Sequence, residues 1–97
     1  MVVLEQPEVD AIELADLLHA LSDPTRLEIV RALASDGARQ CGSFDLGLTK
    51  ATRSHHFKVL REAGLTFTRL EGTARFVTLR RDELDAKFPG LLDAVTR

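Results

Sequence analysis

The chain has 97 residues, of which 44% are hydrophobic and 29% charged, the composition of one ordinary globular domain. No apolar run approaches the roughly 20 residues of a membrane span, so we expect no membrane partner. The N-terminal residues lack the basic start and the long apolar stretch of a signal peptide. Cys41 is the only cysteine, which excludes an internal disulfide and favours a cytoplasmic location.

The formal net charge of −2 conceals an uneven distribution. Residues 1–48 hold three basic and nine acidic side chains, whereas residues 49–81 hold eight basic and two acidic ones. A basic block in an acidic chain is typical of a surface that meets a polyanion. The charge distribution by itself is explained equally well by a charged face that contacts only solvent.

The first half of the chain predicts two helices and a weaker third. Leucines at positions 14, 17, 18 and 21 follow helical spacing and place a first helix at about 9–22. Asp23, Pro24 and Gly37 are typical boundary residues of a second helix. Its inner face is expected to carry Leu27, Val30 and Ala34, with Leu33 beside them.

The stretch RQCGSFDLGL is harder to interpret, because Gly42 and Gly47 weaken any helix. We expect a short third helix at about Gln40–Leu46. Thr49 then caps a fourth helix, Lys50–Ala63, which Gly64 ends.

The fourth helix separates two faces. Phe57, Leu60 and Ala63 share the inner face, and His56 lies at its flank. Ser54, His55 and Lys58 lie on the other side. Because neighbouring residues on a helix diverge by about 100°, the two histidines are a poor clamp for one metal ion.

The remaining chain predicts a hairpin and a broken helix. The runs LTFTRL and ARFVTLR flank a turn at Gly72, with Arg69 and Arg75 near its tip. The tail from residue 82 reads as helix interrupted at Pro89–Gly90, and it carries more apolar surface than a last helix needs. A short helix and turn before a basic helix predict a helix-turn-helix, with the hairpin as a wing.

The strings LLHALSDPTRLEIVRAL, LGLTKATRSHHFKVLREAGL and TRLEGTARFVTLR resemble the ArsR/SmtB family of winged helix-turn-helix regulators. The resemblance covers roughly residues 11–81. It implies a mainly α fold with a small β-hairpin wing, in one domain (1–97). The helix-turn-helix would span about 38–64, the wing 65–80 and the dimerisation segments 9–22 and 82–97. It further implies a homodimer on a two-fold symmetric, double-stranded DNA operator, usually a repressor released by a small inducer.

The resemblance also implies roles for individual residues. The expected DNA-binding residues are Thr49, Lys50, Thr52, Arg53, Ser54, His55, Lys58, Arg61, Arg69, Thr73 and Arg75. The expected dimer interface consists of Leu14, Leu17, Leu18, Leu84, Phe88, Leu91, Leu92 and Val95.

Two positions of the fourth helix depart from simple carry-over. His56 occupies the family's histidine position at the core boundary, where a packing role and a DNA contact are both open. Arg53 stands where the family usually has an apolar residue. Its stem could cover apolar surface, or a short third helix could leave the position open.

A metal effector is the least supported expectation. The family's C-x-C pair is absent, and the last helix has no histidine. His19, Cys41, His55 and His56 remain as candidate ligands for nickel, zinc or copper. Scattered ligands without motif spacing more often bind nothing specific.

Two other functional classes serve as comparisons. A winged-helix protein-interaction module that does not read DNA sequence is the alternative function. An enzyme is not expected, because Cys41 and the histidines have no catalytic spacing and the basic helix would be unexplained.

Overall fold

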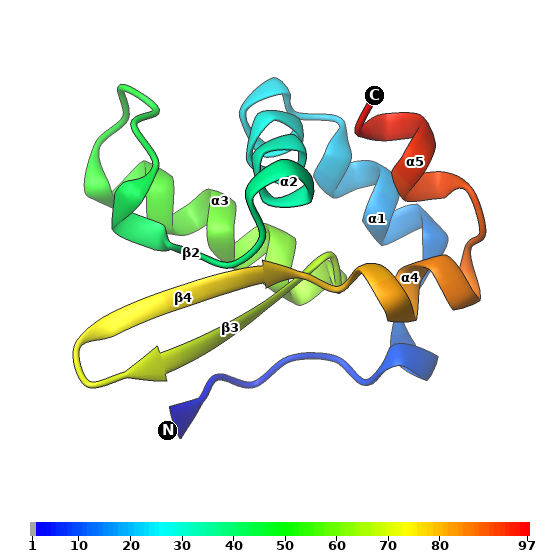
Figure 1. Ribbon diagram of the computed structural model, residues 1–97, viewed down its shortest axis with the longest axis horizontal. Coiled ribbons are helices and arrows are strands. Elements are labelled where there is room, and N and C mark those ends of the chain that lie inside the picture. Colours follow the sequence, from blue (N-terminus) through cyan, green and yellow to red (C-terminus); the bar gives the residue numbers. More distant parts are fainter. Residues whose placement is uncertain (1) are drawn as a thin grey trace.

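The computed structural model describes residues 2–97 and leaves only Met1 of the expected domain outside. Its main helices are α1 (Leu14–Leu21), α2 (Pro24–Asp36) and α3 (Lys50–Ala63). The hairpin of β3 (Thr66–Glu71) and β4 (Ala74–Leu79) follows, then α4 (Arg81–Lys87) and α5 (Leu91–Val95). Figure 1 shows the hairpin at one end of the long axis and α1, α4 and α5 toward the other. The chain is therefore mainly α with a small β-hairpin wing, as the sequence predicts.

The hairpin belongs to a four-stranded antiparallel sheet with the order β1-β3-β4-β2. β1 (Val2–Val3) pairs with β3, and β2 (Arg39–Gln40) pairs with β4. A two-residue turn joins β3 to β4, and its Gly72 takes a φ of +62°. Glycine adopts this conformation without steric cost, which explains its place in the turn.

The N-terminal arm is fastened to the sheet by the side chain of Gln6. Its Nε2 donates to the carbonyl of Thr68 at 2.9 Å, and its Oε1 accepts from the backbone N–H of Thr68 at 2.6 Å. The amide therefore takes the place of a strand residue along β3. It covers part of an edge that would otherwise present unpaired backbone groups.

The expected first helix at 9–22 is wrong in its first half. The chain forms a single 3-10 turn, η1 (Val9–Ala11), becomes extended at Ile12 and enters α1 only at Leu14. Ile12 is 2% exposed and inserts into the core. Lys87 Nζ donates to the carbonyls of Val9, Asp10 and Ile12 at 2.7–3.1 Å. The carbonyl of Val9 also accepts from the backbone N–H of Ile12, whereas those of Asp10 and Ile12 have this distant partner, which no local pattern could reveal.

The second helix has the expected boundaries, with Asp23 as its cap, Pro24 first and Gly37 at its end. Its buried face differs from the prediction, because Leu27 and Ala34 are only half-buried. The buried residues are Arg26, Ile29, Val30 and Leu33.

The expected third helix at Gln40–Leu46 is also wrong. The segment holds the two-residue β2 and one 3-10 turn, η2 (Cys41–Ser43). Phe44 follows and packs on Phe57 of α3 with ring centroids 5.3 Å apart. The low helix propensity of Gly42 and Gly47 thus outweighs the weak helical pattern of this segment.

The C-terminal segment is interrupted at Pro89–Gly90, as expected, and forms α4 and α5. Leu17, Leu84 and Leu92, expected at a dimer interface, are each 0% exposed within the single chain. They belong to the core of one chain, and a second chain cannot contact them in this conformation. Within residues 2–97, no helix is both long enough and apolar enough to span a membrane.

Gly64, where α3 ends, is the tightest glycine position. It takes a φ of +95°, and a Cβ there would lie 2.5 Å from Ile12 Cγ1. We expect Gly64→Ala to lower the free energy of unfolding by about 2–4 kcal/mol, because left-handed strain adds to overpacking. Urea unfolding followed by circular dichroism measures the change.

Gly90→Ala is the matched control. Gly90 has a similar φ of +85°, but no atom lies within 4 Å of its added Cβ. Only the backbone strain remains, so we expect a loss of about 1 kcal/mol. Equal losses for the two variants would show that contact with Ile12 does not matter.

Candidate nucleic-acid interface

The fourth predicted helix is α3, and it has the expected bounds. Thr49 Oγ1 accepts from the backbone N–H of Thr52 at 3.2 Å, which caps the helix. Phe57, Leu60 and Ala63 are buried against the other helices. Lys50, Thr52, Ser54, His55 and Lys58 are exposed, so the expected base and phosphate contacts share the solvent side.

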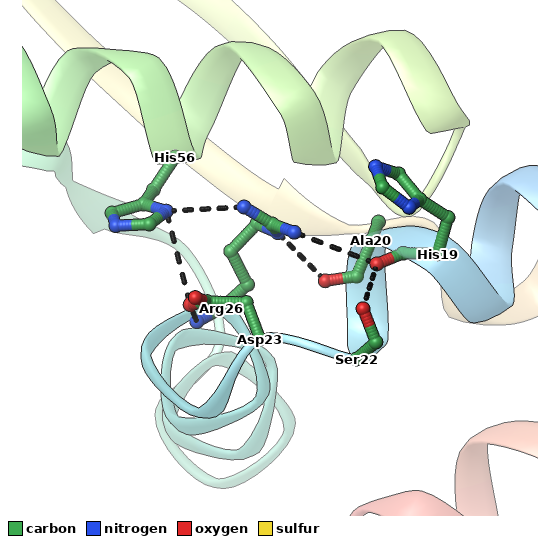
Figure 2. Close-up of polar contacts among 6 residues, drawn as sticks. All are labelled: His19, Ala20, Ser22, Asp23, Arg26 and His56. Atoms are coloured by element: carbon green, nitrogen blue, oxygen red, sulfur yellow. Dashed lines mark hydrogen bonds and ion pairs between the residues drawn. The ribbon is translucent and has the colours of Figure 1, made fainter.

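A buried arginine positions α3 from its flank (Figure 2). Arg26 is only 8% exposed, and its Nε donates to the carbonyl of Ala20 at 2.7 Å. One Nη reaches the carbonyl of His19 at 3.4 Å, and the other lies 3.3 Å from His56 Nδ1. One guanidinium thus connects the end of α1, the start of α2 and the middle of α3.

The contact between Arg26 and His56 links α2 to α3. A guanidinium only donates hydrogen bonds, so a hydrogen bond between the two requires His56 Nδ1 as the acceptor. Asp23 Oδ2 lies 3.9 Å from the same nitrogen. His56 is half-buried at the flank of the core, and these contacts support the structural one of its two open roles.

The side chain of Asp23 stabilises the same corner through a hydrogen bond to the backbone. Its Oδ2 accepts from the backbone N–H of Arg26 at 3.0 Å. This hydrogen bond, assisted by the positive charge of Arg26, holds the pKa of the Asp23 carboxyl below its ordinary value. The cap therefore stays ionised at neutral pH, where it accepts most strongly.

Sequence reasoning missed Arg26, although a signal was present. Arg26, Ile29, Val30 and Leu33 occupy positions i, i+3, i+4 and i+7 of one stripe. A charged residue within an apolar stripe points to a buried, hydrogen-bonded cation.

The wing places its two arginines on opposite faces. Arg69 pairs with Phe76 and Arg75 pairs with Leu70, so the pleat turns the two arginines to opposite sides. Arg75 shares the face of the buried Val77, and it lies near Lys50 and Arg53 at the start of α3. Arg69 lies on the outer face, where its Nε contacts Glu71 at 3.0 Å and its guanidinium lies over Phe76.

Five of the eight basic residues of the basic block make no ion pair within residues 2–97. Arg69, Arg80 and Arg81 are paired with carboxylates. The unpaired residues are Lys50, Arg53, Lys58, Arg61 and Arg75. Four of these five belong to α3, so the free positive charge is concentrated on that helix.

The candidate metal ligands are not brought together. Within residues 2–97, no three His, Cys, Asp or Glu side chains are grouped as they would be around a metal ion. The rings of His55 and His56 are 6.1 Å apart, and His56 is occupied by Arg26. Burial raises the pKa of the Cys41 thiol in the protein without metal.

Comparison with known proteins identifies the family. The family model described as "Helix-turn-helix domain" matches residues 21–66. An uncharacterized HTH-type transcriptional regulator of Bacillus subtilis, YceK, is 42% identical over 84 residues, 84% of each chain. The arsenical resistance operon repressor of Staphylococcus xylosus is 35% identical over 75% of this chain and 71% of its own. The chain belongs to the ArsR/SmtB family of transcriptional regulators.

A solved structure agrees with the fold of this family member. The crystal structure of an ArsR family transcriptional regulator superimposes with a TM-score of 0.68, covering 93% of this chain and 92% of that one. The sequence identity is only 20%, so this likeness concerns the fold. The relatives and the fold are those of transcriptional regulators and not of enzymes.

The buried guanidinium should matter more for stability than an exposed one. We expect Arg26→Met to lower the free energy of unfolding by about 2–4 kcal/mol, because buried carbonyls and His56 lose their donor. Thermal and urea unfolding measure the loss. ¹⁵N chemical shifts of the His56 ring should also change, because Nδ1 loses its partner.

Arg31→Met is the control on the same helix. Arg31 Nε also donates to a carbonyl, that of Val95 at 2.9 Å, but the contact is exposed. Water replaces the lost donor there, so we expect a change within about 0.5 kcal/mol. If both variants lost the same stability, the burial of Arg26 would not be the cause.

Proposed function

We propose that this ArsR/SmtB family member is a transcriptional repressor that binds a two-fold symmetric DNA operator as a homodimer. The observation that carries the proposal is the solvent side of α3, where hydroxyl, imidazole and unpaired cationic groups stand together. Such a face suits the major groove, with the N-terminal residues of the helix at base edges. The repressor role is supported by the name of the Staphylococcus xylosus relative.

Within this proposal the groups divide by task. The base-reading candidates are Lys50, Thr52, Ser54 and His55, because they are exposed on the first turns of α3. Lys58 and Arg61 supply charge to phosphates, and Arg69, Thr73 and Arg75 extend the contact from the wing. The proposal places the protein in the bacterial cytoplasm, on the nucleoid when it is bound to DNA. A metal ion or a small inducer would control it, as in the family. Within residues 2–97, no group of three candidate metal ligands lies together.

A homodimer would form through the end of the molecule away from the wing. Leu14 and Leu18 are 44% and 50% exposed and lie one turn apart on α1. Phe88, Leu91 and Val95 are half-buried and leave apolar surface on the C-terminal segment. A small domain gains from covering such surface. Of the expected interface, these five residues remain.

DNA binding should be specific and salt-dependent. We expect fluorescence anisotropy with the DNA upstream of its own gene to show an affinity that falls with salt, with a logarithmic slope of about −0.9 for each phosphate neutralised. Ser54→Ala or His55→Ala should reduce the preference over unrelated DNA by roughly 10-fold, because base contacts are lost. Lys58→Ala should weaken binding to all DNA alike and lower the slope by about 1.

Other outcomes would separate the alternatives. Wild-type protein that shows no preference for that DNA would refute sequence-specific reading. If charge reversal at Arg69 and Arg75 also left regulation in the cell intact, the protein-interaction module would be favoured.

The oligomeric state tests the apolar end. We expect Leu18→Glu to convert the dimer to a folded monomer in sedimentation equilibrium, because the charge would have to be buried in the interface. Leu48→Glu is the control. Leu48 is also an exposed leucine, at 36%, but it precedes α3 and is not part of the proposed interface. A wild-type monomer, or an unchanged dimer in Leu18→Glu, would contradict this interface.

A further inference from the structure

A cleft of about 650 Å³ lies between the start of α3 and the tip of the wing. Lys50, Arg53 and Ser54 line it from the helix, and Thr73 and Arg75 line it from the wing. Cys41 and its neighbours in β2 and η2 form the third wall, and Phe57 contributes apolar surface. The two elements expected to meet DNA therefore share one cavity.

The cleft has the chemistry of an anion site. Three cations and two hydroxyl groups line it, and no carboxylate does so among the residues that the structure describes. Lys50, Arg53 and Arg75 make none of the ion pairs found within residues 2–97. The charges of Arg75 and Arg53 also act on the Cys41 thiol, where they oppose the effect of burial on its pKa. Two guanidinium groups thus line one cleft, and neither has an anionic partner within residues 2–97.

The wall of the cleft opposite α3 is formed by a short, irregular segment. Only the η2 turn is present where the sequence predicts a short third helix. Phe44 reaches the core at Phe57, one turn further along α3, and leaves Arg53 half-exposed at the cavity wall. An arginine in place of an apolar residue suits such an open position.

We propose that this cleft binds one phosphate group of the operator backbone, with Arg53 and Arg75 donating from opposite sides. The inference rests on the proposed DNA binding. With α3 in the major groove and the wing toward the adjacent minor groove, the sugar–phosphate strand that separates the grooves passes between them. Guanidinium groups match phosphate geometry, since each offers paired donors. Arg53 then fixes the position of the protein along the DNA through a backbone contact and does not read a base.

The test combines Arg53→Met with operator DNA that carries a single neutral methylphosphonate at each backbone position in turn. We expect wild-type protein to lose on the order of 10-fold in affinity at one position in each half-site, because a charge-assisted contact is lost. Arg53→Met should lose a similar factor on unmodified DNA and should be insensitive at that position. Its stem preserves the apolar contacts, and its thermal unfolding should match the wild type.

Lys58→Met is the matched control, since Lys58 lies on the same helix but outside the cleft. It should also lose affinity, yet keep the wild-type sensitivity at the position assigned to Arg53. If Arg53→Met binds as tightly as wild type, or stays sensitive at every position, the phosphate site is refuted. Wild-type protein without any specific binding would instead refute the proposed function.

A free phosphate ligand could offer the same chemistry, and inorganic pyrophosphate distinguishes the two sources. At matched ionic strength, pyrophosphate should displace the operator from wild type no better than from Arg53→Met. Displacement that is stronger for wild type would assign the cleft to a soluble phosphate compound and overturn the backbone assignment.

Discussion

The direction in which α3 presents its outer face depends on one buried cation, the guanidinium of Arg26. It donates to the last carbonyls of α1 and approaches His56 of α3, while its backbone N–H fixes the start of α2 through Asp23. A buried charge is tolerated only when its donors are satisfied, so the three helices must keep the positions that satisfy it. Ser54 and His55 are exposed in a fixed direction because their neighbour His56 is held at the flank.

Sequence patterns predicted the features that local interactions decide. The bounds of α3 follow from Thr49, Gly64 and the stripe of Phe57, and the hairpin follows from its β-rich runs and Gly72. Features decided by distant contacts were not predictable. Where the chain breaks before α1, three carbonyls accept from Lys87, which lies far along the sequence. The burial of Leu17, Leu84 and Leu92 likewise depends on packing, since an apolar stripe does not say whether its own chain or a partner covers it.

The count of basic residues overstates the surface that DNA could meet. Arg80 is 8% exposed, donates to both carboxylate oxygens of Glu83 and reaches the carbonyl of Pro7. It fastens the N-terminal arm and the start of α4, just as Arg26 fastens α3. Arg81 is held by Asp85 and Asp93. Structural cations therefore account for part of the basic block, and the free charge lies mainly on α3 and on one face of the wing.

That face of the wing is selected by strand register. If β4 slipped by one residue against β3, Arg75 would turn to the face of Arg69, and the cleft would lose a cation. The two-residue turn, the Gln6 contact on β3 and the pairing of β2 with β4 all oppose such a shift. β2 can pair only because residues 39 and 40 are extended and not helical. The segment that fails to form the third helix thus supplies a strand that pairs with Phe76 and Val77, directly after Arg75 in β4.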